Sequence, residues 1–135
     1  MLNSLIIGET LKTPSIRFDS KEGLIEITGR SISEDSVKFF SPLFDWLEEY
    51  KRCRQSLTRV SIHLEYFNSS SAKRLYSFLK RATMLSDASH KVEILWYFDK
   101  DDEDMMNTGK DFETLLSFPV KLISNNDNAE LLELK

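Results

Sequence analysis

The segment Asn68-Ser69-Ser70-Ser71 is the densest group of amide and hydroxyl side chains in the chain, and it lies where a predicted strand gives way to a predicted helix. Asn and Ser are common at helix N-termini, where their side chains accept hydrogen bonds from free backbone amides, so capping alone is the simplest interpretation. One capping residue is enough for a helix, yet here four polar residues stand in a row. In open α/β sheets, partners and ligands usually meet the domain at this edge, so the segment is also a candidate partner site.

A basic strip follows on the predicted helix. Lys73 and Lys80 are seven residues apart, as are Arg74 and Arg81, so the members of each pair project in similar directions. A solvated helix face is the ordinary interpretation of such charges. Because the chain has a net charge of −4, the strip is also a candidate docking surface for an acidic partner. The candidate partner-binding residues are therefore Asn68, Ser69, Ser70, Lys73, Arg74, Lys80 and Arg81.

No catalytic or metal-binding motif accompanies these residues. The chain has only four glycines, and none forms a phosphate-binding loop. His63 and His90 are isolated and make a poor metal site. The acidic run Asp99–Asp104 lacks the glycine and the glutamate that a calcium loop of the EF-hand type requires, so we interpret it as a solvated helix start. We therefore expect no enzyme activity, no cofactor and no metal.

Length and composition indicate one ordinary globular domain over residues 1–135, whose tail, 125–135, is expected to form a last helix or to fray. Hydrophobic residues make up 41% and charged residues 30% of the chain. The net charge of −4 argues against general binding of nucleic acid or anionic membranes. No apolar run approaches the ~18 residues of a membrane span, and no signal peptide is recognisable. We expect a cytoplasmic protein.

The predicted elements alternate as in an α/β domain. In chain order they are strands 4–8, 15–19 and 24–28, a helix that begins near Ser33 or at Pro42, strand 57–67, helix 70–86, strand 92–98, a helix from about 101 to 117, and strand 120–123. Strand 57–67 and strand 92–98 should be parallel, since a helix connects them by a right-handed crossover. The fold class is thus a single-layer mixed β-sheet that begins with hairpin-like strands and carries helices mainly on one face.

The first helix and strand 57–67 illustrate the predicted buried faces. On the first helix, the apolar side chains recur at steps of three and four residues. On strand 57–67, every second side chain is apolar. The predicted buried residues are Val37, Phe40, Phe44, Leu47 and Tyr50 on the helix, and Val60, Ile62, Leu64 and Tyr66 on the strand.

Several short segments follow one another in a specific order between residue 10 and about residue 120. They are Thr13-Pro14-Ser15-Ile16, Gly29-Arg30-Ser31-Ile32-Ser33-Glu34-Asp35, Phe39-Phe40-Ser41-Pro42, Asp45-Trp46-Leu47, Tyr66-Phe67-Asn68-Ser69-Ser70-Ser71, Trp96-Tyr97-Phe98-Asp99, Asp101-Asp102-Glu103-Asp104 and Gly109. In their joint spacing they resemble the SiaC family of regulatory phosphoproteins.

The resemblance implies a fold like that of anti-sigma-factor antagonists, the STAS type, and control by phosphorylation. Members of the family are targets of a serine/threonine kinase and a PP2C-type phosphatase. The unphosphorylated type member binds and activates a diguanylate cyclase, which promotes cyclic-di-GMP synthesis and biofilm formation. The phosphorylated residue follows the asparagine of a Tyr-x-Asn motif, a position that Ser69 occupies here in place of the familiar threonine. Ser70 and Ser71 are rival sites.

Two other classes of function stay open. Within binding modules, the alternative is an anti-sigma-factor antagonist that releases a sigma factor by binding the inhibitor of that factor. The other class is an enzyme, which no constellation of residues supports.

Overall fold

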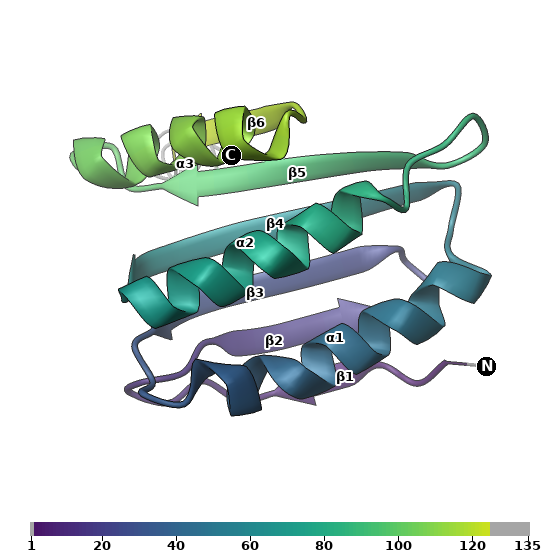
Figure 1. Ribbon diagram of the computed structural model, residues 1–135, viewed down its shortest axis with the longest axis horizontal. Helices are drawn as coiled ribbons and strands as arrows, with labels where there is room; N and C mark the ends of the chain where they lie inside the picture. The colour runs from purple at the N-terminus through teal and green to yellow at the C-terminus, as the bar shows by residue number, and fades with distance from the viewer. Residues whose placement is uncertain (1, 125–135) are drawn as a thin grey trace, which may run out of the picture.

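The computed structural model describes residues 2–124, which form a six-stranded sheet with helices packed on one face (Figure 1). The strands lie side by side in sequence order. Their bounds are β1 Leu5–Ile7, β2 Ser15–Asp19, β3 Leu24–Ser31, β4 Leu57–Phe67, β5 Lys91–Phe98 and β6 Val120–Ser124. The helices are α1 Ser36–Cys53, α2 Ser69–Thr83 and α3 Glu103–Leu116.

The sheet is mixed, as predicted. β1, β2 and β3 pair antiparallel, whereas β3, β4, β5 and β6 pair parallel. Each parallel pair is joined through one helix, and crossovers of one hand that advance in one direction across a sheet place their helices on the same face. The pairing of Val60 with Ile94 confirms the parallel arrangement predicted for strands 57–67 and 92–98.

The strand directions bring four connecting loops to one side of the sheet. Parallel strands end at the same edge, so the loops that follow β3, β4 and β5 lie together. The β1–β2 loop lies there too, because Ile7 pairs with Ile16 and Ser15 pairs with Thr28 near the end of β3. We call this side the carboxyl edge; it comprises residues 8–14, 32–35, 68 and 99–102.

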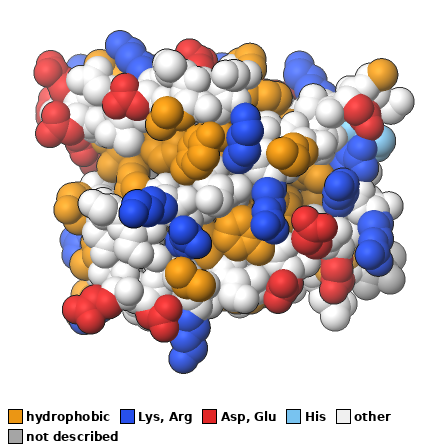
Figure 2. All heavy atoms as spheres, viewed as in Figure 1, with side chains coloured by type: hydrophobic (Ala, Val, Ile, Leu, Met, Phe, Trp, Pro, Cys, Tyr) orange, Lys and Arg blue, Asp and Glu red, His pale blue; other side chains and the backbone are white. Residues whose placement is uncertain are grey.

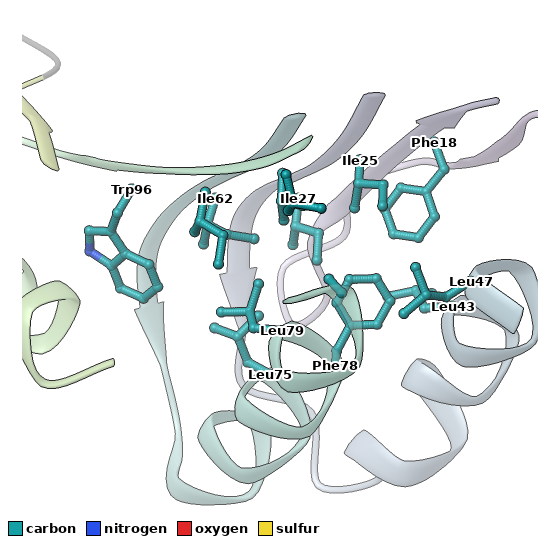
Figure 3. Close-up of a cluster of buried hydrophobic side chains, with 14 of the residues drawn as sticks. Phe18, Ile25, Ile27, Leu43, Leu47, Ile62, Leu75, Phe78, Leu79 and Trp96 are labelled. Carbon is teal, nitrogen blue, oxygen red and sulfur yellow. The ribbon is translucent and has the colours of Figure 1, made fainter. Parts of the chain in front are cut away.

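The core fills the space between the sheet and the helices (Figure 3). Figure 3 shows side chains of β2, β3, β4 and β5 pointing toward those of α1 and α2. The labelled members of this cluster are Phe18, Ile25, Ile27, Ile62 and Trp96 from the sheet, and Leu43, Leu47, Leu75, Phe78 and Leu79 from the helices. This packing holds α1 and α2 against the sheet.

Helix α1 differs from the prediction in its start and in its buried face. Its N-cap is Asp35 rather than Ser33, and the Asp35 carboxylate accepts a hydrogen bond of 3.1 Å from the Lys38 amide. The helix runs through Pro42 instead of starting there. Val37 is 61% exposed because the buried face of the helix begins at Ser36, one position before it, and continues through Leu43 and Trp46, which join the core.

Helix α2 spans Ser69–Thr83, so it begins one residue earlier and ends three residues earlier than predicted. Helix α3 and strand β6 lie where the sequence predicted them, and the acidic run is a helix start. The Asp102 carboxylate caps α3 by accepting a hydrogen bond of 2.9 Å from the Met105 amide. The predicted tail, 125–135, lies outside the described residues. Within the described part of the chain, no helix is long and apolar enough to cross a membrane.

Candidate functional site

Asn68 links three segments at the carboxyl edge. Its side-chain oxygen accepts a hydrogen bond of 2.8 Å from the Ser71 amide, which makes it the N-cap of α2. Its side-chain nitrogen donates to the Ser33 carbonyl over 3.3 Å, and its backbone amide donates to the Ser31 carbonyl over 3.1 Å. The capping interpretation of Asn68 is therefore right, and the same contacts fix where the following serines point.

The three serine hydroxyls differ sharply in their surroundings. Ser71 is buried, and its hydroxyl accepts a hydrogen bond of 2.8 Å from the hydroxyl of Ser31, which is also buried. The Ser70 hydroxyl forms a hydrogen bond with the hydroxyl of Ser36, the first residue of α1. Ser69 is exposed, and its hydroxyl has no hydrogen-bond partner among the described residues. Ser70 is exposed as well, so of the three only Ser69 combines an exposed position with a hydroxyl that no described residue engages.

Ser31 and Ser36 are structural residues of this site that the sequence analysis missed. Ser31 lies in phase with Ile25 and Ile27, so the alternation of β3 places a polar residue at an inward position. A buried hydroxyl needs a hydrogen-bond partner, and that requirement was the available signal. Ser36 carried no comparable signal, because its burial depends on how α1 packs beside α2.

Tyr66 was predicted to face the core, and this prediction is wrong: Tyr66 is 58% exposed. The pairing of β3 with β4 shifts after Gly29 and Leu64, so that Arg30 pairs with Tyr66 and Glu65 becomes an extra residue. Such a bulge interrupts the alternation of side chains and re-aims those that follow. It turns Tyr66 outward at the carboxyl edge, three residues before Ser69.

The four cations of the predicted basic strip do not form one ridge. Lys73 and Arg74 line a hollow between α2 and α3. The Lys80 ammonium turns toward α3 and donates to the Leu116 carbonyl over 3.4 Å. Arg81 turns instead toward α1, where its guanidinium lies 3.9 Å from a Glu48 carboxylate oxygen and 4.8 Å from the centre of the Phe44 ring. Only Lys73 and Arg74 are thus placed near the start of α2 and beside an open hollow.

That hollow, which we call the α2–α3 groove, has a volume of about 530 Å³. Figure 2 shows apolar side chains gathered there between the two helices, with Lys and Arg side chains on the α2 side. Its lining residues are Phe67, Ala72, Lys73, Arg74, Tyr76, Ser77, Thr108, Asp111, Phe112 and Leu115. The sequence analysis missed the groove, because its two walls, α2 and α3, are separated in the chain by strand β5 and meet only in the folded domain.

The remaining ionisable side chains do not gather into a metal site in the part that the structure describes. No three His, Cys, Asp or Glu side chains of residues 2–124 are placed to hold a metal ion together. Among residues 2–124, the clearly shifted pKa is that of Asp87: a hydrogen bond from His90 lowers the pKa of its carboxyl from 3.8 to about 2. The Asp87 carboxylate also forms an ion pair of 2.7 Å with Arg54, at the edge of the sheet opposite the carboxyl edge. Its contacts with Arg54 and His90 stabilise the turn between α2 and β5.

Comparison with known proteins places this geometry in a family. Residues 7–125 match the sequence model of the "SiaC family regulatory phosphoprotein". The chain belongs to the SiaC family. It is 25% identical, over 93% of its length, to the whole of an uncharacterised protein of Pseudomonas aeruginosa strain UCBPP-PA14.

Solved structures of the SiaC family support the same assignment. SiaC of Pseudomonas aeruginosa is 25% identical to this chain and superimposes with a TM-score of 0.81, which covers 91% of this chain and 99% of SiaC. The crystal structure of the diguanylate cyclase SiaD in complex with its activator SiaC matches with a TM-score of 0.82 and 26% identity, over 90% of this chain and 99% of the matched chain. The mixed α/β fold with helices on one face is therefore confirmed.

Proposed function

We propose that this protein is a phosphorylation-controlled switch that binds and activates a diguanylate cyclase when Ser69 is unphosphorylated, and that it has no catalytic activity of its own. Two findings support the cyclase over the anti-sigma-factor alternative: the membership of the SiaC family and the likeness to SiaC in its complex with the cyclase SiaD. A serine/threonine kinase and a PP2C-type phosphatase would set the state of Ser69.

The observation that carries the proposal is the difference between Ser69 and its two neighbours. Phosphorylation of Ser71 or Ser70 would break a hydroxyl pair that ties α2 to β3 or to α1. Phosphorylation of Ser69 breaks no hydrogen bond among the described residues, because its hydroxyl already faces solvent. The domain can therefore accept a phosphate at Ser69 without unpacking.

Helix geometry makes the phosphate acceptable to the free protein. Ser69 is the first residue of α2, and a negative charge at a helix N-terminus is favourable by about 0.3–1 kcal/mol. Lys73 lies four residues further along the same helix, the spacing at which opposite charges attract. The phosphate thus has local support before any partner arrives.

A docked partner changes this balance. The phosphate adds a charge of about −1.5 to −2, and its burial without a designed counter-charge costs several kcal/mol. Since about 1.4 kcal/mol changes affinity tenfold, a modest part of that cost releases the partner.

The test is a binding and activation experiment with the SiaD-type cyclase of the same organism. Wild type and Ser69→Ala should bind it and raise its cyclic-di-GMP output, whereas Ser69→Asp and the phosphorylated protein should bind at least about tenfold more weakly. Ser86→Asp is the matched control, since Ser86 is an exposed serine just beyond the opposite end of α2. Equal binding by Ser69→Asp and wild type would rule out the switch. Phosphopeptide mapping that places the phosphate on Ser70 or Ser71 would show that the assignment of the phosphosite to Ser69 is wrong.

A further inference from the structure

The α2–α3 groove has the form of a docking surface for an extended piece of protein. Its floor is apolar and aromatic, with Phe67 and Phe112 packed 6.3 Å apart between their ring centres. Leu115 lies on the α3 side of the groove and is 61% exposed. Contiguous exposed apolar surface rimmed by polar residues is typical of protein interaction sites.

The groove continues into a second hollow at the carboxyl edge. This acidic hollow has a volume of about 340 Å³, and it shares Phe67 and Thr108 with the groove. Its other lining residues are Glu65, Tyr66, Asp102, Asp104 and Met105. The bulge at Glu65 builds the junction, because it turns Tyr66 outward and directs Phe67 between the two hollows.

The charges along this path are unevenly distributed. The α2 wall of the groove carries Lys73 and Arg74, and Asp111 also lines the groove. The second hollow is lined by Asp102, Asp104 and Glu65, the last of which pairs with Arg30 over 3.0 Å. A complementary ligand therefore carries acidic groups beside α2, apolar side chains over Phe67, and a basic group at the carboxyl edge. This pattern of charged and apolar groups belongs to a polypeptide rather than to a nucleotide or a lipid.

We infer that the α2–α3 groove and the acidic hollow together dock a segment of the cyclase that has acidic residues flanking an apolar centre and a basic residue at one end. This inference rests on the proposed function and names the surface that the switch controls. Phe67 and Ala72, which line the groove, lie on either side of Ser69 in the chain. A phosphate on Ser69 pairs with Lys73, repels the acidic flank of the segment and so removes the attraction at the groove entrance.

The experiment compares Leu115→Arg with Met84→Arg in the full-length, unphosphorylated protein. Both side chains are exposed leucine-sized hydrophobics, at 61% and 64%, but Met84 lies at the end of α2 outside the groove. Binding to the SiaD-type cyclase of the same organism is measured by calorimetry. Leu115→Arg should weaken binding about tenfold or more, while Met84→Arg should change it less than about twofold. Lys73→Glu should also weaken binding, and that effect should shrink as salt rises.

The outcomes separate this inference from the proposed function. If wild type does not bind the cyclase, the proposed function fails and the inference fails with it. If wild type binds and Leu115→Arg binds equally well, the switch stands and the groove is not its docking surface. A photo-crosslinking residue at Thr108 provides the second measurement: it should capture a cyclase peptide with the predicted charges, and capture of a peptide without acidic residues would overturn the assignment.

Discussion

The hydroxyl pair Ser31–Ser71 allows a sharp test of how the site is built. Both side chains are buried, at 3% and 1% exposure, and the Ser31 hydroxyl donates to the Ser71 hydroxyl over 2.8 Å. Ser71→Ala leaves the Ser31 donor without this acceptor in a place that water does not reach. Ser69→Ala removes only an exposed hydroxyl that has no partner among the described residues.

The expected magnitudes follow from what each change leaves behind. A buried hydroxyl stripped of its partner costs about 1–3 kcal/mol of unfolding free energy, so Ser71→Ala and Ser31→Ala should each fall in that range. Removal of both partners leaves no unsatisfied group, so the double variant should cost clearly less than the sum of the two singles. Ser69→Ala should stay within about 0.5 kcal/mol of wild type, as most exposed substitutions do.

Urea unfolding of wild type, the two single variants and the double variant gives the complete cycle, with Ser69→Ala as the control. Additive costs, with no coupling between Ser31 and Ser71, would show that the hydroxyl pair does not hold α2 to β3. A Ser69→Ala variant as unstable as Ser71→Ala would refute the claim that Ser69 alone is structurally dispensable. That result would also remove the main argument for Ser69 as the modified residue.

Two further predictions concern stability away from the site. A Cβ on Gly109 would lie 2.6 Å from the Trp96 ring, so Gly109→Ala should lower the unfolding free energy by about 1–3 kcal/mol, while Gly8→Ala, in open space, should be neutral in the same urea titration. The pKa of Asp87 is lowered from 3.8 to about 2 mainly by the hydrogen bond from His90, so its carboxylate stabilises the fold above about pH 4, and that stabilisation is lost as the pH falls toward 2. Thermal unfolding of wild type and Asp87→Asn should therefore differ at pH 6 and converge near pH 2; an equal difference at both pH values would contradict the assignment.

The sequence by itself determined the elements and their order. Strand 57–67 and the helix after it could be predicted because period-two and period-3.6 patterns depend only on neighbours in the chain. The parallel pairing of β4 with β5 followed from the helix between them. Asn68 could be predicted as a helix cap, and Ser69 as a candidate site, because both arguments are local or rest on family resemblance.

Only the tertiary structure decided which serine is available. Ser70 and Ser71 are engaged by Ser36 and Ser31, which lie 34 and 40 residues earlier in the chain. No local pattern encodes such pairs, because they exist only once β3, α1 and α2 have packed together.

The same reason explains the other differences. The exposure of Tyr66 depends on a register shift against β3, and the separation of Arg81 from Lys73 depends on which helix lies on each side of α2. The α2–α3 groove likewise exists only between packed elements. The periodicity of the sequence predicts which face of its own helix or strand a side chain occupies. Which residues that side chain then contacts depends on how segments distant in the chain pack together.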